Sequence, residues 1–315
     1  MRSRLSAALA PSTPQAFDLL RIGIALILLA KIVGEMPYFF ALYDRNGLAP
    51  WALGSIYLHS SCWYPLHPSC WYPRMSWIAD PAERFGIPSE ITISVIAAGY
   101  IASLLLLLVG FAQRCSALVA YFCHMMMSGS TFLANYGVDK FATVGLFYCC
   151  VAPAGFLSLD RVLFARTIRS TYWATILLRL LQVQLFAVYA VAALAKASHI
   201  SWWNGEAIWM GAMLPTINDR FDASQLAYHP TIAKVLGYST LVVEGFYSCA
   251  MLSRLRIAWV FLIVLMHIVI GVAFDLAFFA GIMIVLNLCA FASREIFDLL
   301  RKAGFHVDDT SAEAK

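Results

Sequence analysis

Long apolar stretches separated by short polar connections run along most of the chain. The first begins near Phe17 and continues past Phe40, and further stretches cover roughly 91–112, 115–134, 139–159, 172–196, 231–252, 255–273 and 276–292. Because an α-helix rises about 1.5 Å per residue, about 20 apolar residues cross a hydrocarbon core about 30 Å thick. The pattern therefore predicts an all-α fold, a polytopic integral membrane helix bundle with about eight transmembrane helices.

The polar segments divide the chain into an N-terminal arm at 1–16, a transmembrane domain at 17–292 and a C-terminal tail at 293–315. Within the domain, the sizeable polar loops lie at about 44–90 and 197–230. Both loops are too short to form an independent catalytic domain. The first apolar stretch is too long for a removable signal peptide and lacks a small-residue cleavage site. We therefore expect one membrane domain.

Composition narrows the class of protein further. Of the 315 residues, 61% are hydrophobic and 13% are charged, whereas about a quarter of a soluble domain is charged. A soluble enzyme is therefore not the default. The net charge of +4 comes without a basic run, so no nucleic-acid partner is expected. There is no phosphate loop, no dinucleotide fingerprint and no closely spaced set of metal ligands. The expected partner is the lipid bilayer.

Lysine and arginine residues predict the orientation, because cytoplasmic loops retain positive charge. With the N-terminus inside, twelve of these residues fall on the inner side: Arg2, Arg4, Arg114, Arg161, Arg166, Arg169, Arg254, Arg256, Arg294, Arg301, Lys302 and Lys315. Six fall on the outer side: Arg45, Arg74, Arg84, Lys140, Arg220 and Lys234. We expect a multi-pass protein of the cell membrane, with both termini in the cytoplasm and both long loops outside.

A tandem repeat in the first long loop carries two of the eight cysteines. Cys62 and Cys70 each lie in the sequence Ser-Cys-Trp-Tyr-Pro. Two thiols this close in an oxidising compartment can close a small loop, so a disulfide and two free thiols both remain open. The repeated Trp and Tyr suit the headgroup layer of a membrane.

Charged residues inside the apolar stretches are the most informative positions. Each costs roughly 2.5–3.5 kcal/mol at mid-bilayer and persists when it is paired or functional. In the first stretch, Lys31 and Glu35 are four residues apart and share one face of a helix. In the fifth stretch, the spacing predicts one polar stripe that faces the bundle interior. Its members are Arg179, Gln182, Tyr189 and Lys196.

Depth along the helices predicts a partner for Glu244. Arg179 lies roughly 10 Å from the inner end of its helix and Glu244 about 20 Å from the outer end of its own, which places them at nearly the same level. We therefore expect an ion pair between Arg179 and Glu244. His267 lies within one or two turns of that level, and the third stretch carries His124. A structural ion pair and a working proton path both fit these positions.

The fifth stretch and the residues after it carry a family resemblance. The segment from Gln184 to Ala197, followed by Trp202-Trp203-Asn204-Gly205, resembles the HTTM membrane domain, the transmembrane core shared with vitamin K-dependent gamma-glutamyl carboxylase. That family typically has a tyrosine, small residues and a lysine at the helix end, then a Trp and a Gly. The resemblance covers about 17–292, through Arg21 with Gly23, the sequence Asn-Gly-Leu-Ala-Pro at 46–50, Asn135-Tyr136-Gly137, Ser158-Leu159-Asp160, Glu244, and His267 before Gly271.

The resemblance implies a set of candidate site residues. Lys196 matches the lysine proposed as the base that deprotonates reduced vitamin K, and Glu244, His267 and Tyr136 are further catalytic candidates. Tyr136 stands where the family has a histidine after the asparagine. A reduced quinone is the cofactor that the resemblance implies, and the candidates for binding it are Arg179, Gln182, Tyr189 and Trp203. Partial desolvation at a membrane boundary disfavours the charged form of a lysine, as a base requires.

Three classes of function remain open from the sequence. The first is a membrane enzyme that acts on a quinol-like lipid or on a peptide. The second is a non-catalytic accessory membrane protein in peptide maturation, export or immunity. The third is a transporter, although transporters commonly have repeated halves and helices broken at the midplane. Here Pro153 interrupts a stretch near its cytoplasmic end, and the halves show no repeat.

Overall fold

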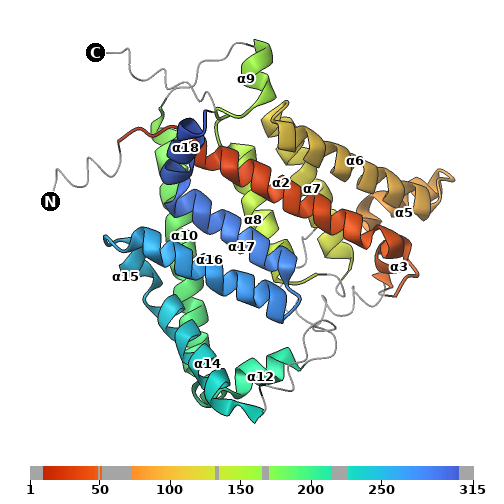
Figure 1. Ribbon diagram of the computed structural model, residues 1–315. Helices are drawn as coiled ribbons and strands as arrows, with labels where there is room; N and C mark the ends of the chain where they lie inside the picture. Colours follow the sequence, from red (N-terminus) through yellow and green to blue (C-terminus); the bar gives the residue numbers. More distant parts are fainter. Residues whose placement is uncertain are drawn as a thin grey trace, which may run out of the picture. The chain divides into compact units, whose positions relative to one another are not determined.

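A computed structural model describes residues 10–48, 50–51, 73–131, 135–164, 170–213, 226 and 228–304. Every regular element within these ranges is a helix (Figure 1), apart from an isolated antiparallel bridge between Ser12 and Thr171. The predicted all-α fold is confirmed. Cys62 and Cys70 lie outside the described residues.

The chain divides into two compact units. The N-terminal unit is Leu20–Thr167, and the C-terminal unit is Ile168–Lys315 together with Met1–Leu19. Helix α2 (Gln15–Glu35) begins in the segment assigned to the C-terminal unit and continues into the N-terminal unit. Each unit is described separately below.

The N-terminal unit contains most of α2 and a series of helices that follow it. These are η1 (Met36–Tyr38), α3 (Phe39–Tyr43), α5 (Ser76–Arg84), α6 (Ser89–Val109), α7 (Gln113–Ser130), α8 (Gly137–Val151) and α9 (Leu159–Phe164). Helix α7 packs against both α6 and α8. The chain reverses between α6 and α7 at Gly110, whose φ of 71° is in the left-handed region that favours glycine.

Arg21 holds one end of this unit together. Its side chain is fully buried, and the guanidinium donates hydrogen bonds to the carbonyl oxygens of Leu107, Leu108 and Leu157. Leu107 and Leu108 lie in the last turn of α6, where backbone carbonyls have no partner within the helix. A cation at this position is also favoured by the helix dipole. Arg21 therefore ties α2 to the end of α6 and to the segment before α9.

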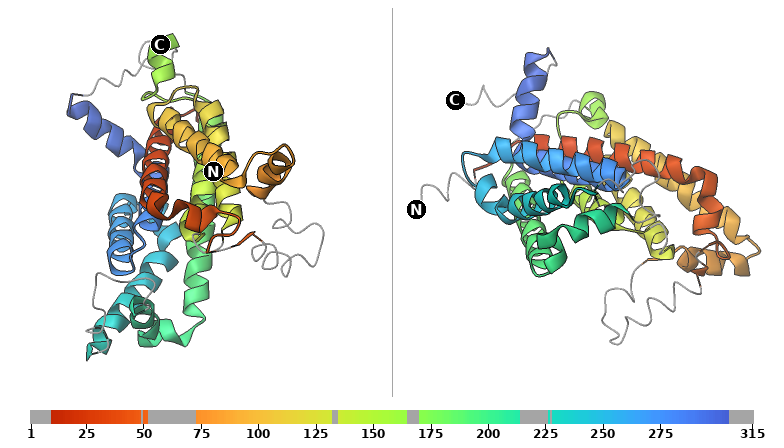
Figure 2. Two further views of the ribbon diagram at one scale, coloured as in Figure 1. Left: turned by 90° about the vertical axis from the view of Figure 1, so that its right-hand side faces the viewer. Right: turned by 60° about the horizontal axis from the view of Figure 1, so that its bottom comes forward.

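The C-terminal unit is arranged around the long helix α10 (Tyr172–Ala197). It also contains α11 (Ile200–Asn204), α12 (Glu206–Ala212), α14 (Pro230–Gly245), α15 (Tyr247–Met251), α16 (Arg256–Ala273), α17 (Ala277–Phe291) and α18 (Ser293–Lys302). Helix α10 packs against α14, α15 and α17, and the short helices α11 and α12 pack against α14. Helices α16 and α17 run side by side, as the views in Figure 1 and Figure 2 both show.

Among the described residues, three helices are long and apolar enough to cross a membrane: α6, α10 and α16. Helices α17 and α18, bent by 84° between them, make a fourth if the pair is one span. A helix also lies in each of the other predicted stretches, but these helices are less suited to spanning. Helix α2 carries Asp18, Arg21, Lys31 and Glu35, while α8 and α14 have 15 and 16 residues, short of the usual 20 or so.

Three of the predicted stretches are interrupted in the structure. The first ends as a regular helix at Glu35, because Pro37 lies in the next element, η1, and a proline has no N–H to continue a helix. The stretch at 139–159 ends as a helix at Val151, because the residue before Pro153 is extended. The stretch at 231–252 is divided at Phe246, which separates α14 from α15.

Candidate functional site

The end of α10 carries the lysine that the sequence singles out. The Nζ atom of Lys196 lies 2.7 Å from Oε1 and 2.5 Å from Oε2 of Glu244 on α14. The Glu244 side chain is 6% exposed, whereas the Lys196 side chain is 22% exposed. The carboxylate is therefore almost fully enclosed, while the amine remains within reach of a molecule from outside the unit.

This geometry overturns the predicted ion pair between Arg179 and Glu244. The depth estimate assumed that α14 begins level with the end of α10. In the structure the first turns of α14 pack against α11 and α12 instead, so closely that a Cβ on Gly237 would lie 2.5 Å from the carbonyl oxygen of Trp202. Helix α14 therefore meets the end of α10 late in its course, where Glu244 lies opposite Lys196.

The predicted polar stripe of α10 faces the interior only in part. Tyr189 is buried at 2% exposure. Arg179 is exposed and donates a hydrogen bond to Oε1 of Gln182 at 2.8 Å. Gln182 in turn donates to the carbonyl oxygen of Ala290 on α17 at 2.6 Å. Arg179 and Gln182 thus contact each other, away from the Lys196–Glu244 pair.

Trp202, the neighbour of the cofactor-binding candidate Trp203, contacts Lys196. The Lys196 Nζ lies 5.2 Å from the centre of the Trp202 ring, a distance at which the ring face attracts a cation. The Trp203 indole instead donates to the carbonyl oxygen of Ala197 at 2.8 Å, one of the carbonyls left free at the end of α10. Both tryptophans are in the sequence segment after α10, but helical periodicity does not predict which of two adjacent side chains contacts the lysine.

A cluster of buried aromatic and amide side chains surrounds Tyr189, which lies two helical turns before Lys196 on α10. The rings of Tyr189 and Tyr247 stack with centres 4.0 Å apart. Asn287 bridges them: its Oδ1 accepts from the Tyr247 hydroxyl at 2.7 Å, and its Nδ2 donates to the Tyr189 hydroxyl at 2.8 Å. Sequence reasoning missed Tyr247 and Asn287, although Asn287 is the single amide in the apolar stretch at 276–292 and marks a buried polar contact.

His267 lies against the same group. Its ring meets Tyr189 edge-on, with centres 6.2 Å apart, and its Nδ1 is 2.9 Å from the carbonyl oxygen of Ile263. A carbonyl oxygen only accepts, so Nδ1 carries a hydrogen, and in the neutral form of the ring Nε2 carries the lone pair. His267 is close enough to interact electrostatically with Lys196, and Tyr189 with Glu244. We call Lys196, Glu244, Trp202, Tyr189 and His267 the Lys196 site.

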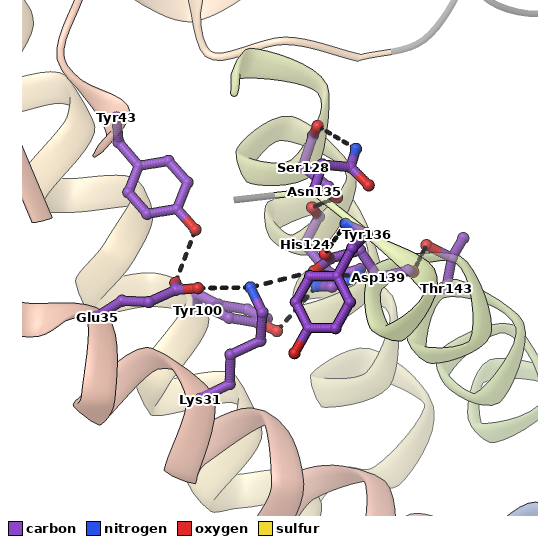
Figure 3. A network of polar contacts seen from close by, with 10 residues as sticks. All are labelled: Lys31, Glu35, Tyr43, Tyr100, His124, Ser128, Asn135, Tyr136, Asp139 and Thr143. Carbon is purple, nitrogen blue, oxygen red and sulfur yellow. Dashed lines mark hydrogen bonds and ion pairs between the residues drawn. The ribbon is translucent and has the colours of Figure 1, made fainter. Parts of the chain in front are cut away.

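Tyr136, the remaining catalytic candidate, belongs to the N-terminal unit. It precedes the first residue of α8, and its backbone N–H donates to Oδ2 of Asp139 at 3.1 Å. This contact joins Tyr136 to a second polar group, which we call the Lys31 cluster (Figure 3). Its members are Lys31, Glu35, Tyr43, Tyr100, His124 and Asp139.

Ion pairs form the centre of the Lys31 cluster. Lys31 Nζ lies 2.7 Å from Oε1 of Glu35, which confirms the predicted contact within α2, and 3.2 Å from Oδ1 of Asp139 on α8. The Tyr43 hydroxyl donates to Oε2 of Glu35 at 2.8 Å.

His124 joins the cluster to α6 and α7. Its Nε2 is 3.1 Å from the carbonyl oxygen of Asp139, and its Nδ1 is 3.0 Å from the Tyr100 hydroxyl. A cavity of about 10 Å³ lies among these side chains, which is room for about one water molecule. Sequence analysis did not identify Asp139 or the two tyrosines as members of a site. Asp139 lies at the end of an apolar stretch, and the tyrosines carry no charge.

The described residues contain no group of three or more His, Cys, Asp and Glu side chains placed to hold a metal ion. Comparisons with protein-family models, with curated proteins and with solved structures find no match to the chain.

Proposed function

We propose that this protein is an integral membrane protein of the HTTM type, in which Lys196 acts as a base on a quinol-like lipid at the outer membrane boundary. The residue resemblance around α10 motivates the family, and the apolar helices α6, α10 and α16 fit a membrane location. The proposal includes about eight passages through the bilayer. Helices with internal charges, such as α2, can cross if those charges are satisfied inside a bundle.

The contact between Lys196 and Glu244 carries the proposal. A lysine ammonium has no lone pair, so a base at this position must first lose a proton. Glu244, 2.5–2.7 Å away, can take that proton from Nζ onto a carboxylate oxygen. The pair has no net charge before or after this transfer, so the transfer avoids the large cost of an isolated charge in an apolar environment.

The neutral amine then accepts a proton from the hydroxyl of the substrate. The product is a substrate anion next to a lysine cation, which is electrostatically favourable where water is scarce. The partial exposure of Lys196 gives the substrate access. The Trp202 ring beside Nζ supplies a flat apolar surface of the kind on which an aromatic ring system packs.

A soluble naphthoquinone pair provides the test. We expect 2-methyl-1,4-naphthoquinone to quench tryptophan fluorescence of the purified protein in liposomes, because Trp202 lies at the site. Under anaerobic conditions, the reduced form should show the absorbance of the quinol anion when it is bound. Lys196→Arg should bind the probe without forming the anion, since arginine stays protonated. Lys234→Arg, an exposed lysine on α14, is the matched control and should behave as the unaltered protein.

Two results would contradict the proposal. Anion formation by Lys196→Arg equal to that of the unaltered protein would remove the base role of Lys196. It would favour a non-catalytic accessory protein. Absence of quenching by the quinone in the unaltered protein would remove the quinol-like lipid as the substrate.

A further inference from the structure

Helix α18 leaves the end of α17 at a sharp angle. The two helices are bent by 84° at their junction, as the right-hand view of Figure 2 shows. A helix of 10 residues is about 15 Å long, so at this angle α18 advances by only about 2 Å along the axis of α17. If α17 crosses the bilayer, α18 therefore runs parallel to the membrane surface.

An ion pair places α18 at the end of α17 where α16 begins. Arg256, the first residue of α16, pairs with Glu295 in the first turn of α18. Helices α16 and α17 run side by side, so the start of α16 and the whole of α18 lie at one end of this helix pair. The distribution of lysine and arginine predicts that this end faces the cytoplasm.

The side chains of α18 separate into an apolar and a polar face. Ile296, Leu299 and Leu300 are three and four residues apart and share one face of the helix, with Phe297 beside Leu300. Phe297 is fully buried in the unit, whereas Leu299 is 64% exposed. The unit thus covers only part of the apolar face. A helix with an apolar face opposite a face rich in lysine and arginine is typical of helices that lie in a membrane interface.

The charge at this end of the unit is mostly positive. Helix α18 has two carboxylates, and both pair with arginines: Glu295 with Arg256, and Asp298 with Arg301. The other basic side chains of α18 and of the turn before α16 are exposed: Arg254, Arg294 and Lys302. This end therefore presents an excess of positive charge to a partner.

Exposed apolar side chains accompany this charge. Leu252, Leu255 and Ile257, around the start of α16, are 76%, 60% and 44% exposed. A partner that fits this end must offer negative charge beside an apolar layer, and the surface of a bilayer that contains anionic lipids has both. A second copy of the same end would instead bring like charges together, which is unfavourable.

We propose that α18 and the turn before α16 bind the anionic headgroups of the cytoplasmic leaflet. We call this region the α18 surface, and its members are Arg254, Leu255, Arg294, Leu299 and Lys302. The basic side chains donate hydrogen bonds to phosphate oxygens of the lipids, while Leu299 enters the boundary of the acyl chains. The inference rests on the membrane location proposed above and uses no residue of the Lys196 site.

Hydrogen–deuterium exchange of the purified full chain in liposomes tests the inference. Liposomes of phosphatidylcholine are compared with liposomes that also contain phosphatidylglycerol, which adds negative charge to the surface. The backbone amides of α18 should exchange at least about fivefold more slowly in the charged liposomes, which is the effect of one basic side chain near an anionic surface. Added salt should reduce the difference, because salt screens exposed charges.

Variants separate the contributions of charge and of apolar contact. Arg294→Gln combined with Lys302→Gln removes two exposed charges and should abolish most of the difference between the liposomes. Arg84→Gln combined with Lys234→Gln removes two exposed charges elsewhere, and this matched control should keep the difference. Leu299→Ser should speed the exchange of α18 in both kinds of liposome, because it removes an apolar contact with the lipid.

An alkaline carbonate wash of the liposomes tests the membrane location independently. Release of the chain by the wash would overturn that location, and this inference with it. In a retained chain, slower exchange that persists without Arg294 and Lys302 would overturn this inference alone. Equal exchange of α18 in the two kinds of liposome would also overturn it, and would leave an acidic protein surface as the partner of α18.

Discussion

The pair formed by Lys196 and Glu244 predicts an asymmetric response to removing one partner or the other. Lys196→Met leaves a carboxylate that is 6% exposed without its cation, and breaking a buried pair in this way costs about 3–5 kcal/mol. Glu244→Gln leaves a lysine that is 22% exposed and can turn toward water. Its cost is the loss of charge-assisted hydrogen bonds, about 1.5–3 kcal/mol. The lysine variant should therefore be the less stable one.

The assay is the free energy of unfolding in mixed micelles of dodecyl maltoside and sodium dodecyl sulfate. The double variant Lys196→Met with Glu244→Leu should recover much of the loss, because two well-packed apolar groups can replace a buried ion pair. Arg179→Met combined with Glu244→Gln is the control, and its effects should add, because the two residues do not pair. Equal losses in the two single variants, or a double variant as unstable as their sum, would refute this account of the pair.

Three further predictions concern other parts of the chain. Gly110→Ala should destabilise the protein by about 1–2 kcal/mol or more, because its φ is 71° and a Cβ would lie 2.8 Å from that of Ser158; a melting temperature equal to that of the unaltered protein would contradict this. Asn287→Leu leaves two buried tyrosine hydroxyls without their bridge and should cost about 2 kcal/mol in the same micelle assay, whereas no loss would mean that the bridge contributes nothing. Reporter fusions after Lys302 should be cytoplasmic and those within 60–80 should be outside, and the same side for both would contradict the predicted topology.

Apolar patterning predicted a helix in each of eight stretches, and the structure has one in each. Patterning could not show where those stretches break, because the hydrophobic pattern continues on both sides of the local turns at Pro37 and Phe246. The contact between Lys31 and Glu35 followed from helical periodicity, which fixes neighbours within one helix. The prediction for Glu244 named the wrong partner, because the position of Glu244 along α10 depends on how α14 packs on α11 and α12. That packing cannot be predicted from the spacing of residues along the chain.

The charges of α2 have a consequence for the order in which the protein is made. Arg21 binds carbonyl oxygens as far along the chain as Leu157, and Lys31 pairs with Asp139, so the ribosome makes α2 well before the groups that satisfy it. Release of α2 into lipid at that moment would expose its cations to hydrocarbon, which costs roughly 2.5–3.5 kcal/mol for each charged side chain. If α2 crosses the bilayer as proposed, it must therefore remain beside the insertion machinery or close to water until α8 and Leu157 have followed. On the proposed topology, α2 is made early in its unit and is thus among the last parts of that unit to reach its final environment.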